Sequence, residues 1–88
     1  MNAMPVLTPD WITKRGGDMW VNADASNWVV FLNSEPQYML TPCPAAGKFM
    51  CQVKQTNNGK RLESGNTYPG LEDAVRGGLE DLRKVLGW

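Results

Sequence analysis

Side chains that could perform acid–base or nucleophilic chemistry are few in this chain of 88 residues. Histidine is absent, which removes the commonest general base near neutral pH and the commonest metal ligand. Ser-His-Asp and Cys-His machinery is therefore impossible within the chain. Two cysteines without histidine do not make an ordinary structural zinc site. We predict no catalytic, metal-binding or cofactor-binding residue, and we expect a protein that is not an enzyme.

The two thiols, Cys43 and Cys51, flank a predicted turn around residues 44–48. In one interpretation they face each other across a hairpin and form a disulfide. In the other they are two small, buried apolar side chains. Residues 1–7 contain neither the basic region nor the apolar core of a signal peptide, so we expect a cytoplasmic location. Because stable disulfides are rare there, we favour the second interpretation.

Acidic residues occur as adjacent pairs, Glu72-Asp73 and Glu80-Asp81. Neighbouring acids on a helix point in different directions, so neither pair converges on a metal or a substrate. We interpret them as a solvated helix face that carries i,i+4 ion pairs. The expected ion pairs are Glu72–Arg76 and Glu80–Lys84.

Tryptophan is abundant for this length, with Trp11, Trp20, Trp28 and Trp88. An aromatic patch could bind a ligand, a base or a protein partner. The alternative, which we favour, is packing in the core and at its rim. Trp88 follows the last predicted helix, and we expect it to fold back onto the body of the protein or onto a dimer mate.

Basic side chains cluster around Asn58-Gly59, where Lys54, Lys60 and Arg61 lie close in sequence. With Lys48 they could form a basic stripe on an open sheet face, which suits nucleic-acid binding. The order of hairpin and helix resembles that of small three-stranded-sheet DNA-binding domains and the later part of double-stranded-RNA-binding domains, although no motif of either is present. Nine basic and nine acidic residues give zero net charge, which disfavours this alternative.

A β-hairpin is predicted over residues 48–64. Its first strand alternates between two sets of side chains, and we expect the apolar set to face the core. Asn58-Gly59 is a strong signal for a two-residue loop, which places Gln55 opposite Leu62. The core-facing set is Phe49, Cys51 and Val53, and the solvent-facing set is Met50, Gln52 and Lys54.

An amphipathic helix is predicted over residues 71–87, because apolar residues recur there at helical spacing. Gly87 is placed to end it. Two glycines within this helix, Gly77 and Gly78, together cost roughly 2 kcal/mol relative to alanine. We expect Gly78 to allow close approach of the helix to the sheet; the alternative is simple tolerance.

The first half of the chain predicts a short helix and three strands. Thr8 is placed to cap the helix, Pro9 suits its first position, and Leu7 and Ile12 suit a hydrophobic staple. Strands are expected at 19–22, 27–33 and 37–41, with turns at 23–26 and 33–36. Pro42 and Pro44 should end the third strand or place it at an edge, because proline donates no hydrogen bond. Residues 28–32 are continuously apolar, which indicates a central strand covered on both faces or one whose second face meets a partner.

These elements predict one α+β domain over residues 1–88. An antiparallel sheet of four to five strands, a meander of hairpins, is covered on one face by the long C-terminal helix. The chain has no apolar run long enough for a membrane span. We expect a binding module for a protein partner or a second copy, with nucleic acid or a small molecule in a Trp-lined pocket as alternatives. The expected surface comprises Met50, Gln52, Lys54, Lys60, Arg61 and Trp88.

Overall fold

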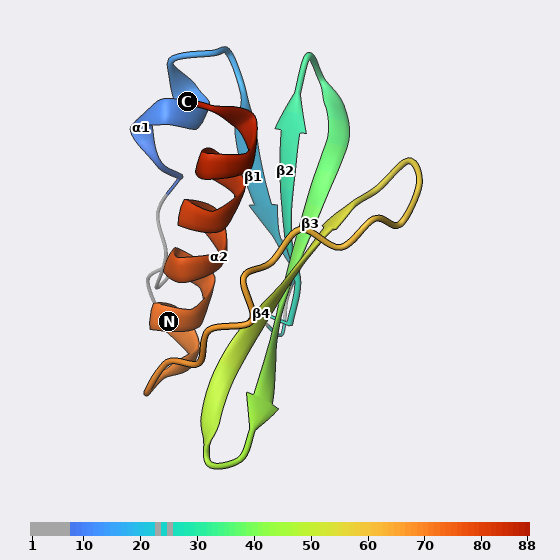
Figure 1. The fold of residues 1–88 in the computed structure, drawn as a ribbon. Coiled ribbons are helices and arrows are strands. Elements are labelled where there is room, and N and C mark those ends of the chain that lie inside the picture. The colour runs from blue at the N-terminus through green and yellow to red at the C-terminus, as the bar shows by residue number, and fades with distance from the viewer. Residues whose placement is uncertain (1–7, 23, 25) are drawn as a thin grey trace.

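A computed structural model describes residues 8–22, 24 and 26–88 of the chain. Its elements, in chain order, are α1 (Asp10–Thr13), β1 (Asp18–Val21), β2 (Trp28–Leu32), β3 (Glu35–Ala45), β4 (Lys48–Gln55) and α2 (Leu71–Leu86). In the described residues the strands form one antiparallel meander in the order β1-β2-β3-β4. Both helices lie on the same side of the sheet, as Figure 1 shows. The predicted α+β class, with a helix over one sheet face, is confirmed.

The core lies between α2 and the face of the sheet that α2 covers. Alternate residues of the strands point to this face, and Trp28, Leu40 and Val53 are fully buried there. The apolar stripe of α2 meets them with Val75 and Leu82, which are also fully buried. Period-two strands and a period-3.6 helix therefore contribute to one continuous cluster.

The two interior glycines of α2 allow close contacts, Gly78 with the sheet and Gly77 with the connection that precedes the helix. A Cβ atom at Gly78 would lie 2.5 Å from Sγ of Cys51 and 3.1 Å from Cδ2 of Leu40. A Cβ atom at Gly77 would overlap the ring of Tyr68. The predicted close approach at Gly78 is confirmed, and Gly77 has an equivalent reason.

The third strand is longer than predicted, because β3 continues through Pro42 and Pro44 to Ala45. The backbone groups of Phe49 and Val53 in β4 form hydrogen bonds on the side away from β3. The even-numbered residues of β4 therefore direct their backbone hydrogen bonds toward β3. In the observed register those residues pair with the odd-numbered residues of β3. The nitrogens of Pro42 and Pro44 therefore point away from β4, beyond the end of β2, where the ladder needs no donor.

The predicted two-residue loop at Asn58-Gly59 is wrong. Gln55 N–H donates to the carbonyl of Lys60, at 2.9 Å, so the loop contains four residues and places Val53 beside Leu62. Gly59 has φ +72°, and its N–H donates to the Gln55 carbonyl. The register differs from the predicted one by two residues, and Leu62 consequently remains on the expected face.

Residues 60–64 do not form the predicted second strand of this hairpin. They make a single bridge, between Lys54 and Arg61, and Val53 N–H donates to the side chain of Glu63 instead of a backbone carbonyl. Further along, Tyr68 and Phe49 exchange two backbone hydrogen bonds, and Ser64 is bound to Asp81 of α2. This connection therefore covers the β4 edge and links it to the helix.

The short N-terminal helix exists, but its predicted cap is wrong. Pro9, not Thr8, occupies the N-cap position, with ψ 151°, and the helix begins at Asp10. It has only four helical residues instead of about two turns, because a turn over residues 14–16 ends it. Leu7 of the predicted hydrophobic staple lies outside the described residues.

Two further turns differ in detail from their predictions. The turn between β2 and β3 contains only Asn33 and Ser34, with φ values of 56° and 63°, so Glu35 and Pro36 belong to β3. In the turn predicted over residues 23–26, positions 23 and 25 lie outside the described residues. Ser26 N–H in that turn donates to the side chain of Asn22, at 2.9 Å.

The ion pairs on α2 agree in part with the predictions. Glu72 and Arg76 are paired at 3.9 Å, as expected. The pair expected between Glu80 and Lys84 is wrong, because Glu80 binds Arg83 at 2.8 Å. Gly87 ends the helix with φ 75°, which confirms its predicted role.

Candidate functional site

The face of the sheet opposite the helices carries an apolar surface. We name it the open face and define it by Trp20, Val29, Phe31, Met39 and Met50. Val29 and Met39 each lie between two buried residues of their strands, so they point to the other face. Trp20 pairs with Val29 and Val29 with Met39, so one row of apolar side chains crosses three strands.

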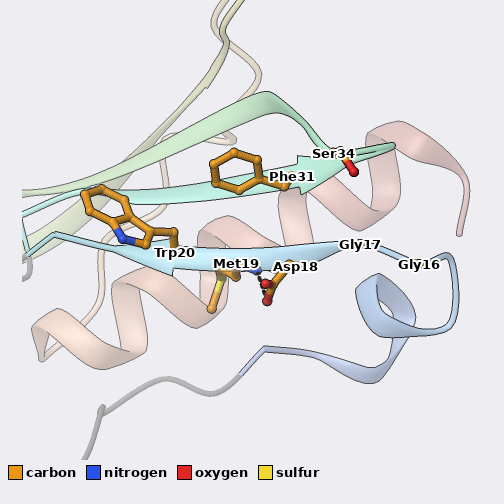
Figure 2. A pocket seen from close by; sticks show the side chains of 7 residues that line it. All are labelled: Gly16, Gly17, Asp18, Met19, Trp20, Phe31 and Ser34. Atoms are coloured by element: carbon orange, nitrogen blue, oxygen red, sulfur yellow. Dashed lines mark hydrogen bonds between the residues drawn. The ribbon is translucent and has the colours of Figure 1, made fainter.

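Trp20 is the most prominent residue of the open face. Its side chain is 54% exposed, and Val85 is the other large apolar residue exposed to this degree in the described part of the chain. Trp20 and Phe31 lie on one side of β1 and β2, whereas Met19 points to the opposite side (Figure 2). They line a hollow of about 580 Å³ together with Gly17 and Ser34. This end of the open face is therefore concave, with the apolar Trp20 and Phe31 beside the polar Asp18 and Ser34.

Three residues of the predicted binding surface belong to the same side of the sheet. Met50, Gln52 and Lys54 alternate with the core-facing residues of β4 and are half-buried. Lys54 pairs with Met39 and ends the apolar row with a charged side chain at the β4 edge. Sequence reasoning therefore identified one side of the open face.

Arg61 bridges to Lys54 and therefore belongs to the same side, where its side chain is paired with Glu63. Lys60 and Trp88 do not join this surface. Lys60 is exposed beside the loop that follows β4. Trp88 packs on the helix side, edge-on to Trp11 with ring centroids 5.9 Å apart. The expected fold-back of Trp88 onto the body is confirmed.

The carboxylate of Glu63 neutralises the charge of Arg61, which would otherwise extend a basic stripe. Burial alone would raise its pKa, but hydrogen bonds from Arg61 and from Val53 N–H outweigh burial, so the pKa lies below its ordinary value of 4.5. Glu63 therefore remains an anion beside Arg61 at neutral pH. Of the three basic residues grouped by sequence, one is committed to an ion pair within the protein.

The two cysteines lie on opposite faces of the sheet. Cys43 pairs with Met50, and Cys51 pairs with Pro42, so their side chains point in opposite directions. Both are free thiols, and this register cannot support the disulfide considered from the sequence. Burial, followed by the charge of Cys43, raises the pKa of Cys51 to about 12. Only Cys51 is fully buried as we predicted, since Cys43 is half-buried beside the open face.

Sequence reasoning missed Trp20, Val29, Phe31 and Met39 as surface residues. The available signal was the continuous apolar run at 28–32, which indicated a strand with two apolar faces. One helix can cover only one face of a sheet, so half of this run had to face outward. In the structure β2 is central, with Trp28 and Val30 buried in the core on the helix side and Val29 and Phe31 on the other side.

Within residues 8–22, 24 and 26–88, no three Cys, Asp or Glu side chains are grouped to hold a metal ion. In the same part of the chain, no helix has the length and apolar character needed to cross a membrane. Comparisons of the chain with protein-family models, curated proteins and solved structures found no match.

Proposed function

We propose that this protein is a non-enzymatic binding module that docks a protein partner on its open face. The observation that carries the proposal is the apolar row of Trp20, Val29 and Met39 on the face that neither helix covers. Contiguous exposed apolar surface is typical of interaction sites, and tryptophan is enriched among residues that dominate binding energy.

The edges of the open face give it the character of a protein interface. Lys54 and Gln52 lie on its β4 side, so an apolar centre has polar residues at its margin. The ion pair between Arg61 and Glu63 neutralises one of the basic residues there, and the net charge of the chain is zero, which favours a protein over a nucleic acid.

Site-specific photocrosslinking tests this proposal. We expect benzoylphenylalanine in place of Met39 to crosslink a protein in extract from the source cell. The same group in place of Val85 should not, although Val85 is equally exposed, at 56%, because it lies on the helix side. The crosslink should disappear in the Trp20→Lys variant, which places a charge in the apolar row.

The mass of the crosslinked product distinguishes a second copy of this chain from a different protein. Sedimentation of the unmodified protein provides an independent measurement of self-association. Equal crosslinking from both positions, or none from position 39, would contradict docking on the open face.

A further inference from the structure

A second hollow lies on the helix side and is lined by residues of the β2–β3 turn, of the segment after α1 and of the end of α2. These three segments lie at the same end of the molecule (Figure 1). Its volume is about 430 Å³, within the range of roughly 300–1,000 Å³ typical of small-molecule sites. The residues that line it include Arg15, Leu32, Tyr38, Leu86 and Trp88.

Arg15 supplies a positioned cation at this hollow. Its guanidinium carbon lies 4.1 Å from the centroid of the Trp88 ring, and Nη1 donates to the Trp11 carbonyl at 3.3 Å. Within the described residues, no carboxylate forms an ion pair with it. Since a guanidinium has five N–H donors, most of its hydrogen-bonding capacity remains for an anion.

Tyr38 supplies a polar group from the floor of the hollow. Tyr38 is 9% exposed, and its hydroxyl forms no hydrogen bond with any of the described residues. Among these residues, Trp28 Nε1 is the one buried side-chain nitrogen or oxygen without a partner. The Tyr38 hydroxyl is therefore accessible to solvent, and we infer that it opens at the hollow that Tyr38 lines.

The apolar wall of the hollow is fixed before any ligand binds. Trp88 is held by its edge contact with Trp11, by its N–H bond to the Arg83 carbonyl at 3.1 Å, and by Arg83 Nη1, which donates to its carbonyl at 3.2 Å. Leu32 and Leu86 complete the wall. A preformed wall lowers the ordering cost of binding.

We propose that this hollow binds a small aromatic carboxylate. Arg15 pairs with the carboxylate, the Tyr38 hydroxyl donates a hydrogen bond to it, and the aromatic body packs against Leu32, Leu86 and Trp88. The site lies on the opposite side of the sheet from the open face and does not depend on docking there.

Titration with phenylacetate, followed by NMR of the four tryptophan indole N–H signals, tests this site. We expect a saturable shift of the Trp88 signal below about 10 mM, while the Trp20 signal remains unchanged. Phenylacetamide, which has the same body without the charge, should give no saturable shift. A Trp88 signal that does not respond to phenylacetate would overturn the proposal.

Variants separate recognition from loss of packing. Arg15→Gln should abolish saturation, whereas Lys14→Gln, the same change of charge one residue away, should leave the affinity unchanged. Tyr38→Phe keeps the ring and removes only the hydroxyl, so we expect roughly tenfold weaker binding with Trp88 still in place. Unchanged affinity in both Arg15→Gln and Tyr38→Phe would overturn the assignment.

Discussion

The two thiols differ in their surroundings, and this difference predicts their reactivity. Cys51 is 4% exposed, and burial raises its pKa to about 12, whereas Cys43 is half-buried on the opposite face. Because the thiolate is the reactive form, we expect one fast thiol in the native protein and two after denaturation. Reaction with Ellman's reagent measures this count. Cys43→Ser should remove the fast phase; a fast phase that survives this change would contradict the assignment of faces.

Glu63 predicts a pH dependence of stability. Its folded-state pKa is lowered, so it contributes stability that is complete above its ordinary pKa of 4.5 and is lost as pH falls through the folded-state value. Glu63→Gln keeps an acceptor for Val53 N–H but loses the charge that binds Arg61. We expect it to lower the free energy of unfolding by about 1 kcal/mol at pH 7.

Urea denaturation at pH 7 and at strongly acidic pH measures this effect. The difference between Glu63→Gln and the parent protein should shrink in acid, because the parent carboxylate is then protonated as well. Glu72→Gln is the control, since Glu72 is exposed and its ion pair is longer, at 3.9 Å. A difference that stays constant with pH would show that the charge of Glu63 does not matter.

At the scale of single elements, the packing of α2 predicts a stability change for Gly78→Ala that is opposite to the one helix propensity predicts. Alanine favours a helix over glycine by about 1 kcal/mol, yet a Cβ at position 78 would meet Cys51 at 2.5 Å. We expect Gly78→Ala to destabilise the protein by roughly 1–3 kcal/mol, because overpacking outweighs propensity. Thermal and urea unfolding measure it. Lys84→Ala, at an exposed position of the same helix, should be nearly neutral; a stabilised Gly78→Ala protein would contradict this packing.

The turn of the β3–β4 hairpin contains a strained backbone conformation at Ala46 that a substitution can relieve. Ala46 has φ 52°, a left-handed conformation that costs a residue with a Cβ roughly 1–2 kcal/mol. We expect Ala46→Gly to raise the midpoint of urea denaturation by removing this cost. Ala45→Gly is the matched control: Ala45 belongs to β3, so glycine there should lower the midpoint. A lower midpoint for Ala46→Gly would contradict the turn geometry.

The elements differed in how far the sequence determined them. The alternation of β4 and the apolar stripe of α2 repeat at characteristic periods, so both could be predicted. The length of β3 could not, because Pro42 is tolerated only where β2 ends, and that depends on strand register. The absence of a second strand after Gln55 depended on a side chain, since Glu63 takes the Val53 N–H that such a strand would need.

At the scale of the whole molecule, the sheet separates two candidate sites. Tyr38 and Met39 are neighbours in the chain, yet one is buried on the helix side and the other belongs to the open face. The sequence indicated the separate apolar residues but not their grouping, because the grouping requires knowing which face α2 covers. Predicting the hollow at Arg15 would have required the tertiary arrangement as well, since three segments distant in sequence line it.

This arrangement predicts that the two sites bind independently. Trp20 and Trp88 lie on opposite sides of the sheet, and Trp20 does not line the hollow at Arg15. We therefore expect Trp20→Lys to leave the affinity for phenylacetate within about twofold of the parent value, as measured by the Trp88 indole signal. Coupling between binding sites is reciprocal, so saturating phenylacetate should also leave the crosslinking yield from position 39 unchanged. A change in affinity of more than about fivefold, matched by a change in crosslinking, would mean instead that β2 and β3 shift together when either site is occupied.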